Sequence, residues 1–230
     1  MSNIWTVIPA AGESKRFREA GYSMPKPLLR IKSPAGEEAY MVQHVIADLP
    51  SWLRAGVVIA LPSHLDKPID LEERTISIPH TIGQADTVYQ AIKTLPDNDL
   101  VLVLDCDMIL KSEDILKLVE LLNIYDVTVA VTETFDPNAS RVDQVPFPSR
   151  FVEKEPISKW GIVGARAFKS AAVLSVALER TFDRCTARHQ EPYLSMAMNP
   201  YPGSKFAHVI TDYIDLGTPE RIKEAGWEIL

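Results

Sequence analysis

A chain of 230 residues with 46% hydrophobic and 24% charged residues is long enough to bury a large core and has the composition of an ordinary globular protein. Its net charge of −7 argues against a general nucleic-acid-binding protein, although a few local cations would suffice to hold a nucleotide. The two cysteines form neither a disulfide framework nor a zinc-binding pattern, and neither a membrane span nor a signal peptide is recognisable. We therefore expect a soluble, cytoplasmic protein that binds neither nucleic acid nor membranes.

Continuous apolar runs alternate with helix-like segments through the first half of the chain. We expect buried strands over residues 4–10, 55–61, 100–104 and 126–132, a short strand over 75–78, and helices over 37–49, 84–95 and 113–122. Ser112 is expected to cap the last of these helices. Such alternation is typical of a mostly parallel sheet that is covered on both faces.

The pattern changes after residue 132. Residues 134–148 are rich in Pro, Asp and Asn and are expected to form a loop or flap. Beyond them we expect strands over 150–153, 160–165, 205–210 and 213–216, helices over 168–182 and 218–225, and short helical pieces between 184 and 201. No repeat or long linker divides the chain.

Small residues follow the first predicted strand. Ala10, Ala11 and Gly12 leave backbone N–H groups free to face a ligand, and a cradle of this kind binds anions, above all phosphates. Two cations follow, Arg16 and Lys26, and prolines on both sides of Lys26 restrict its backbone. The stretch is consistent with a polyphosphate site and equally with a surface loop that carries solvated charges.

Two carboxylates follow the strand predicted over residues 100–104. Asp105 and Asp107 would share a face if the strand continued, and carboxylates in this arrangement can hold a hard cation such as Mg²⁺. Asp107 is the favoured ligand because it lies further toward the edge where such sheets bind ligands. Alternatively, one acid caps the next helix and the other is solvated. Asp215, which precedes Gly217, is a second candidate acid, or else a turn or capping residue.

Gly83 and Gln84 open a predicted helix. The missing side chain at Gly83 would let a base or ribose approach the backbone, and Gln84 could hydrogen-bond to it, but a plain helix start explains the pair as well. Lys154 lies between two glutamates and is, on its own, typical of a solvated charge run. Cys106 is expected to be a small packing residue, and the histidines lack partners at metal-ligand spacing.

Several of these segments resemble a known family. Pro9-Ala-Ala-Gly12, Arg16 and Pro25-Lys-Pro-Leu28 are similar to the signature of the sugar-phosphate nucleotidyltransferases, the NDP-sugar pyrophosphorylases. The resemblance continues in order with a base-binding glycine at Gly83, a metal aspartate at Asp107, a Val-Glu-Lys-Pro-like segment at 151–156, a glycine-bearing sugar-site strand at 160–164 and an Asp-Ile-Gly-Thr-Pro-like element at 215–219.

The resemblance implies a Rossmann-like nucleotide-diphospho-sugar transferase fold, an α/β architecture with a mostly parallel mixed sheet flanked by helices. It implies that a phosphate oxygen attacks the α-phosphorus of a nucleoside triphosphate in line and that pyrophosphate leaves. We expect one domain over residues 1–230, in which half 1–132 binds the nucleotide and half 133–230 binds a sugar 1-phosphate or a similar phosphorylated small molecule. An oligomer is compatible with this organisation.

The resemblance also implies roles for single residues. Arg16 would hold the β- and γ-phosphates, and Lys26 would neutralise charge where the acceptor meets the α-phosphate, so both would be catalytic. Asp107 and Asp215 would bind Mg²⁺ between the phosphates. The other residues implied in binding are Ala10, Ala11, Gly12, Gly83, Gln84 and Asp105 for the nucleotide, and Lys154 and Gly164 for the acceptor.

The sequence departs from the family pattern at two positions. Glu13 stands where the Gly-x-Gly-x-Arg turn usually has a glycine, so we expect the loop to sit differently over the phosphates. The glutamine that reads the base has no equivalent near Ile78, so the base is left open.

Three functions are weighed against these residues: a nucleotidyltransferase, a glycosyltransferase of the same fold and a non-catalytic nucleotide-binding protein. Some short relatives activate phosphocholine with CTP, and the spacing from Arg16 to Pro25 resembles members found in capsule and surface-polysaccharide synthesis. A metal-dependent glycosyltransferase of the same fold would use the strand-end acids, but it has no pyrophosphate to expel and so gives no reason for Arg16 and Lys26. A non-catalytic nucleotide-binding protein would not need both acids and all three cations.

Overall fold

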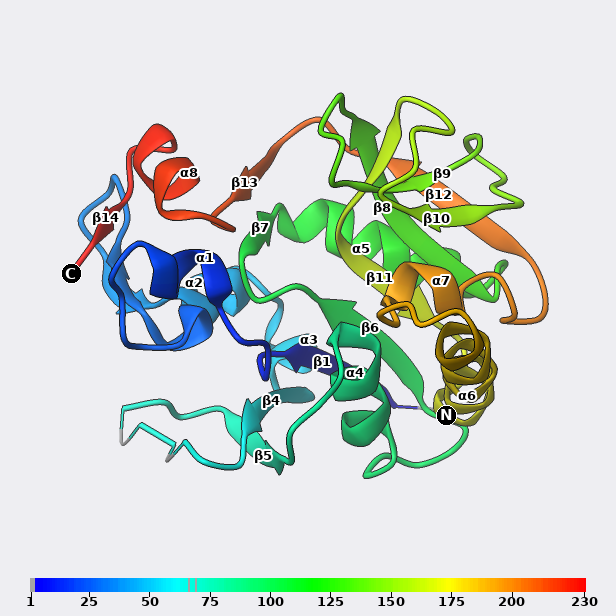
Figure 1. Ribbon diagram of the computed structural model, residues 1–230, viewed down its shortest axis with the longest axis horizontal. Helices are drawn as coiled ribbons and strands as arrows, with labels where there is room; N and C mark the ends of the chain where they lie inside the picture. The colour runs from blue at the N-terminus through cyan, green and yellow to red at the C-terminus, as the bar shows by residue number, and fades with distance from the viewer. Residues whose placement is uncertain (1–2, 66, 69) are drawn as a thin grey trace.

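The computed structural model describes residues 3–65, 67–68 and 70–230 (Figure 1). Within these residues the centre of the molecule is a nine-stranded sheet. Its strands are β1 (Ile4–Pro9), β4 (Val57–Pro62), β5 (Arg74–Ile78), β6 (Leu100–Leu104), β8 (Val127–Glu133), β9 (Ser140–Val142), β10 (Phe151–Glu153), β11 (Trp160–Phe168) and β12 (Lys205–Val209).

The sheet joins a parallel part to a mixed part. Strands β5, β4, β1 and β6 lie side by side and are all parallel, so their carboxyl ends share one edge. Strand β11 is antiparallel to both β6 and β8, and β12 pairs in parallel with β8. Because the first-half strands are parallel, the loops after β1 and β6 meet at the same edge, which is where the predicted site residues lie.

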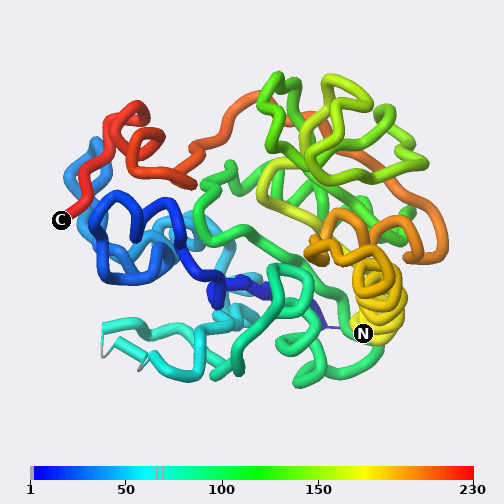
Figure 2. Tube along the Cα trace, viewed as in Figure 1, coloured from blue at the N-terminus to red at the C-terminus, as the bar shows by residue number. Residues whose placement is uncertain are grey.

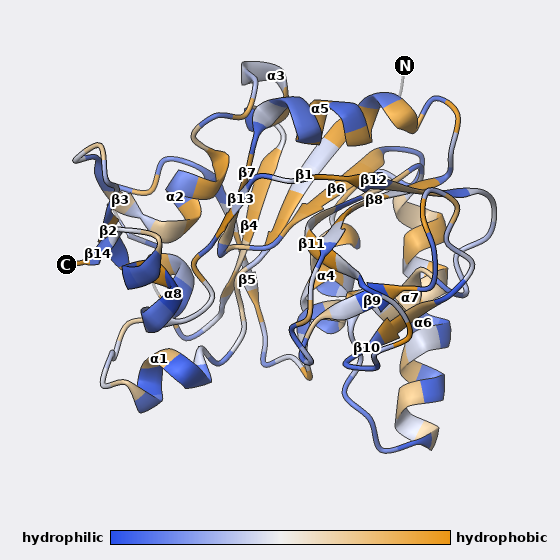
Figure 3. Cartoon of the chain, turned by 90° about the horizontal axis from the view of Figure 1, so that it is seen from above, coloured by the Kyte–Doolittle hydropathy of each residue, from blue (hydrophilic) through white to orange (hydrophobic). Residues whose placement is uncertain are grey.

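Helices cover both faces of the sheet (Figure 3). Alternate residues of each strand point to opposite faces, so Val7 packs with α4 (Gln84–Ile92) and α6 (Ala171–Ala187), while its neighbour Ile8 packs on the other side. The second face is covered by α2 (Met41–Ile46), α3 (Ser51–Arg54) and α5 (Ser112–Leu121). In the described part of the chain, no helix is both long enough and apolar enough to cross a membrane.

A third, smaller core joins the segment after β1 to the C-terminal segment, which lies beside it in Figure 2, on the side away from the N-terminus. Phe17, Leu216 and Ile222 pack together in it, and β14 (Glu228–Ile229) pairs with β2 (Arg30–Lys32), which also pairs with β3 (Glu38–Tyr40). The core brings α1 (Lys15–Glu19), α8 (Pro219–Glu224) and Leu29, which follows the 3₁₀ turn η1 (Lys26–Leu28), together. A separate ribbon pairs β7 (Met108–Leu110) with β13 (Tyr213–Asp215), which brings the segment after β6 next to Asp215.

Three local predictions were wrong. The helix expected over residues 37–49 begins only at Met41, because Glu38–Tyr40 pairs as a strand with β2 and Tyr40 forms a capping box with Gln43. Ser112 does not cap α5; it lies inside the helix, and its Oγ donates to the carbonyl of Asp48. The loop expected over 134–148 contains strand β9, which pairs with β10. A short helix, α7 (Leu194–Ala197), lies within the region of turns.

Candidate active site

A cleft of about 1,630 Å³ opens at the carboxyl edge of the parallel strands. It is lined from the first half of the chain by the loop after β1, by the segment that enters α4 and by the segment after β6. From the second half it is lined by the loop after β8, by β11, by the loop after α6, and by β13 and the segment that leads from it into α8. Most of the predicted site residues line it: Ala10, Ala11, Gly12, Arg16, Lys26, Gly83, Gln84, Asp105, Asp107 and Asp215.

The loop after β1 is tied to the lysine that follows it. Ser14 adopts a left-handed backbone with φ of 52°, and its Oγ accepts a hydrogen bond of 2.8 Å from the backbone N–H of Lys26. A side chain built on Gly12 would meet no heavy atom within 4 Å, so this part of the loop is open to the cleft. The turn therefore holds Lys26 beside an exposed backbone, as a phosphate site requires.

The unusual residue in this turn is Ser14 rather than Glu13, which corrects the expectation from sequence. Counted back from Arg16, the second glycine of a Gly-x-Gly-x-Arg turn falls at position 14, and this is the position with the left-handed backbone that favours glycine. Glu13 is exposed and pairs with Arg18 at 3.1 Å. It does not distort the loop.

Lys26 and Asp107 form an ion pair in the cleft. The distance from Nζ to Oδ2 is 2.6 Å, and the two side chains are only 22% and 16% exposed. Burial opposes the charged form of the lysine, but the neighbouring Asp107 carboxylate outweighs it and raises the pKa of Lys26. The ammonium group is therefore a fixed positive charge at neutral pH. Between the two aspartates, burial raises the pKa of the Cys106 thiol to about 12, so this residue stays neutral.

Asp107 and Asp215 converge on one point. A Cβ built on Gly217 would lie 2.9 Å from Oδ1 of Asp215 and 3.0 Å from Oδ2 of Asp107, so only glycine leaves this space free. The backbone N–H of Gly217 donates to Asp215 at 2.8 Å, and that of Leu216 donates to the carbonyl of Asp107 at 2.8 Å. Burial raises the pKa of Asp215.

This pair of acids is suited to a hard divalent cation. Both contribute carboxylate oxygens, which Mg²⁺ prefers, and the cradle at Gly217 brings them toward a common point. No group of three or more His, Cys, Asp or Glu side chains in the described ranges is placed to hold a metal. Two carboxylates supply only part of an octahedral shell, so an ion bound here would keep positions for phosphate oxygens and water, as is usual for Mg²⁺.

Asp105 lies on a different wall from Asp107. Strand β6 ends at Leu104, so the two acids do not share a face as they would in a continuing strand. Oδ1 of Asp105 accepts from Nε2 of Gln84 at 2.6 Å and from Nη1 of Arg166 at 2.9 Å. Asp105 therefore joins α4, β6 and β11, and the choice of Asp107 as the metal ligand stays a prediction.

Gly164 and Lys154, both predicted to bind the acceptor, are outside the cleft lining. Gly164 has a φ of 52° at an irregular point of β11, and a Cβ there would lie 2.5 Å from Cβ of Met108, so its glycine is explained by packing against β7. Lys154 is exposed, and its Nζ donates to the hydroxyl of Tyr193 at 2.8 Å, an interaction that raises the pKa of the lysine. Tyr193, not Lys154, reaches the cleft.

Residues 6–185 match the sequence model of the MobA-like NTP transferase domain. The chain belongs to this family. The curated proteins include no sequence match to this NTP transferase.

Solved structures support the same fold for the transferase. It resembles a nucleoside-diphosphate-sugar pyrophosphorylase from Vibrio cholerae RC9, with a TM-score of 0.72, 17% identity, and coverage of 96% of this chain and 98% of the other. It also resembles a UTP-bound UGPase from Acinetobacter baumannii, with a TM-score of 0.70, 18% identity, and coverage of 98% of this chain and 92% of the other. A third similar structure is an inositol-1-phosphate CTP transferase from T. maritima, with a TM-score of 0.71, 13% identity, and coverage of 98% of this chain and 94% of the other. The expected Rossmann-like nucleotidyltransferase fold is confirmed.

The transferase carries two arginines in its cleft that sequence reasoning missed. Arg221, on α8, pairs with Asp215 and, at 2.7 Å, with Asp136 on the loop after β8. Arg166 is almost fully buried and pairs with Asp105. Arg166 lies 61 residues from Asp105, and Arg221 lies 85 residues from Asp136, so these two pairs have no local signal. A charged residue amid the apolar strand 160–168 could nevertheless have marked Arg166 as needing a partner.

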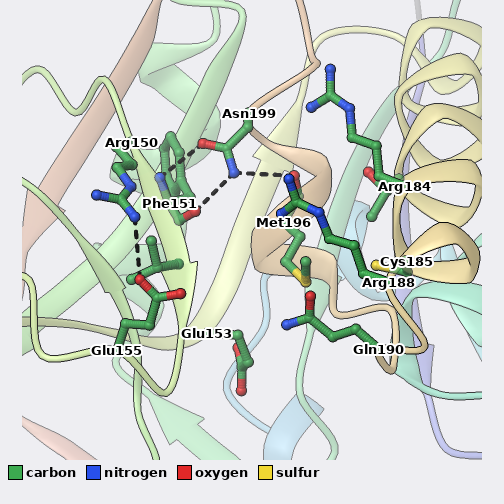
Figure 4. Close-up of a pocket in the computed structure, with 12 residues that line it drawn as sticks. Arg150, Phe151, Glu153, Glu155, Arg184, Cys185, Arg188, Gln190, Met196 and Asn199 are labelled. Atoms are coloured by element: carbon green, nitrogen blue, oxygen red, sulfur yellow. Dashed lines mark hydrogen bonds and ion pairs between the residues drawn. The ribbon is translucent and has the colours of Figure 1, made fainter.

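Glu153 separates the cleft of the transferase from a second cavity of about 240 Å³ (Figure 4). Its Oε2 accepts from the hydroxyls of Ser140 and, at 3.0 Å, of Ser195, which fixes the carboxylate between β9, β10 and α7. Arg184 on α6 and Arg188, the residue after α6, line the second cavity, and Asn199 bonds to the backbone of Phe151 across from them. Glu153 was not among the predicted site residues.

Proposed function

We propose that this NTP transferase joins a nucleoside triphosphate to a sugar 1-phosphate, or to a similar phosphorylated small molecule, and releases pyrophosphate. The observation that carries the proposal is the convergence of Lys26, Asp107 and Asp215 next to the open loop after β1. A cation that is held charged and two acids at one point are what nucleotidyl transfer needs, because this chemistry relies on positioning and charge neutralisation.

The reaction would proceed by in-line displacement. An oxygen of the acceptor's phosphate attacks the α-phosphorus of the nucleotide, a new oxygen–phosphorus bond forms, and the bond from the α-phosphorus to the oxygen bridging to the β-phosphate breaks. The electron pair leaves with pyrophosphate. No general base is required, because the attacking phosphate oxygen is already an anion. Lys26 would neutralise charge at the α-phosphate, and Arg16 would hold the departing pyrophosphate.

The proposed reaction includes a metal ion bound by two acids. Asp107 and Asp215 would hold Mg²⁺, which would neutralise phosphate charge. In the structure the same acids pair with Lys26 and Arg221, and these two cations hold the carboxylates in position in the cleft.

Each half of the chain would bind one of the two substrates. We assign the nucleotide to residues 1–132 and the acceptor to 133–230. The fixed Glu153 carboxylate suits the hydroxyl groups of a sugar, and Lys154 would have to leave Tyr193 to hold the acceptor's phosphate. A product of this kind, made in the cytoplasm where nucleoside triphosphates are available, would serve surface-polysaccharide or capsule synthesis.

One assay tests the function. The protein is incubated with Mg²⁺, each of ATP, GTP, CTP, UTP and dTTP, and a panel of sugar 1-phosphates and phosphocholine, and pyrophosphate is measured. We expect release that requires both a nucleotide and an acceptor. Transfer of sugar from an NDP-sugar, with no pyrophosphate from any pair, would instead establish a glycosyltransferase.

A further inference from the structure

The second cavity, of about 240 Å³, lies between the end of α6, strand β10 and helix α7. Its volume is a little below the roughly 300–1,000 Å³ of pockets that enclose drug-sized ligands, so an occupant would be small. Part of the wall is apolar and consists of Phe151, Val152, Cys185 and Met196. Burial raises the pKa of the Cys185 thiol, so this residue is neutral too. The cavity therefore offers an uncharged surface to one part of a ligand.

Two exposed arginines complete the wall at the end of α6. Arg184 lies in the last turn of the helix, and Arg188 follows the helix directly. Residues four apart on a helix are neighbours, so these two like charges repel each other. Figure 4 shows the side chain of Arg188 reaching from α6 toward Met196 and Asn199. Among the described residues, no carboxylate forms an ion pair with either arginine.

The acids that line the same cavity are already engaged. Glu155 pairs with Arg150 at 3.2 Å, and the carboxylate of Glu153 accepts hydrogen bonds from two serine hydroxyls. With three arginines and two glutamates in its wall, the cavity carries a net positive charge. The charges of Arg184 and Arg188 are thus left for an anion from outside the chain.

We propose that the second cavity is a binding site, separate from the cleft, for a small phosphate ester with an apolar body. Arg184 and Arg188 would hold the phosphate, which at neutral pH carries about two negative charges and three acceptor oxygens, a match for two guanidinium groups. The apolar body would lie against Phe151 and Met196. The proposal does not depend on the reaction proposed for the cleft.

Two methionines can report on the two sites separately. Met196 lines the second cavity, and Met108 lines the cleft. The chain has only six methionines, so a nuclear magnetic resonance spectrum of methyl-¹³C-methionine protein is simple, and Met196→Leu and Met108→Leu assign the two signals. The probe is phenyl phosphate. Inorganic phosphate and phenol each carry one of its two parts and are titrated beside it.

We expect phenyl phosphate to shift the Met196 signal in a saturable way and to bind more tightly than inorganic phosphate or phenol. Replacing both arginines, Arg184→Gln with Arg188→Gln, should weaken this binding about 10- to 100-fold, the range for lost hydrogen bonds to a charged group. Arg180→Gln is the matched control, because Arg180 is exposed one turn earlier on α6 and does not line the cavity. This variant, and Lys26→Ala in the cleft, should leave the titration of Met196 unchanged.

Several outcomes would overturn the proposal. One is a Met196 signal that does not respond, or that responds equally in the double arginine variant. A response to phenol as strong as that to phenyl phosphate would show an apolar cavity without an anion site. A response of Met108 alone would place the phosphate in the cleft. Because phenol and phenyl phosphate are compared in the unaltered protein, and turnover is not measured, neither a misfolded variant nor failure of the proposed reaction affects the result.

Discussion

Lys26 and Asp107 stand 81 residues apart in the sequence, and their side chains meet at 2.6 Å in the cleft. The pair joins the loop after β1 to the segment after β6, two pieces that the parallel strands deliver to the same edge of the sheet. It keeps the ammonium group of Lys26 charged in a partly enclosed place. A phosphate group entering the cleft would compete with Asp107 for Lys26, and a metal ion would compete with Lys26 for Asp107.

Removing either member of this pair should slow turnover without unfolding the protein. We expect Lys26→Ala and Asp107→Asn each to reduce the rate of pyrophosphate release by ~10²–10³, as is typical for the loss of a preorganised charge at the reacting group. Thermal unfolding of each variant checks that the fold is intact. Near-normal turnover in either variant would remove that residue from the site.

Asp105→Asn should reduce turnover less than Asp107→Asn does, but it should clearly lower the stability of the protein. The change leaves the buried guanidinium of Arg166 beside a neutral group, and a weakened buried charged hydrogen bond costs about 1–3 kcal/mol. For a chain of this size each kcal/mol lowers the melting temperature by about 2–4 °C. Calorimetry of Asp105→Asn and Asp107→Asn side by side measures the difference, and a larger loss of stability in Asp107→Asn would contradict it.

Ser14→Ala tests which residue controls the phosphate turn. Without Oγ, the backbone N–H of Lys26 loses its acceptor, which we expect to cost about 1 kcal/mol of stability and to lower turnover several-fold by releasing Lys26. Glu13→Ala, one residue earlier, removes only an exposed ion pair and should leave both quantities close to those of the unaltered protein. A larger effect from Glu13→Ala would restore Glu13 as the important departure.

Gly217→Ala tests the carboxylate cradle. The backbone at Gly217 is outside the left-handed region, so alanine should fold there, but its methyl group would press on both Asp107 and Asp215. We expect the affinity for Mn²⁺, followed by electron paramagnetic resonance as a substitute for Mg²⁺, to fall about 10- to 100-fold, comparable to the loss of a supporting group at a metal site. An unchanged Mn²⁺ affinity would mean that the metal binds elsewhere.

The parts of the fold that follow from local pattern could be predicted from sequence. The apolar runs over residues 100–104 and 126–132 gave the positions of β6 and β8 to within a residue, because a strand buried on both faces must be apolar throughout. The strand Glu38–Tyr40 could not be predicted in this way. It is held by pairing with β2, and its own short polar sequence shows no period.

The same distinction between local pattern and distant contacts applies to the residues of the site. Lys26 and Asp107 are recognisable because each follows a structural break at a fixed spacing. Arg221 pairs with Asp136, and Tyr193 bonds to Lys154, and because both partners are distant in sequence, only the folded chain shows these contacts. The sequence predicts Gly164 to be an acceptor-site residue because it is a glycine in a motif-like strand. In the structure a side chain at this position would collide with Met108, which explains the glycine by packing.

The order of these pieces along the chain has a consequence for synthesis on the ribosome. Every strand of the nine-stranded sheet precedes residue 210, but Asp215 enters the cleft only when β13 pairs with β7 and Leu216 joins the core around Phe17. Domains fold as they emerge from the N-terminal side. The nascent chain can therefore form its sheet and the loop after β1 while it still lacks one of its two converging carboxylates. On the proposed function, we expect it to be unable to consume nucleoside triphosphate until that last ribbon has docked.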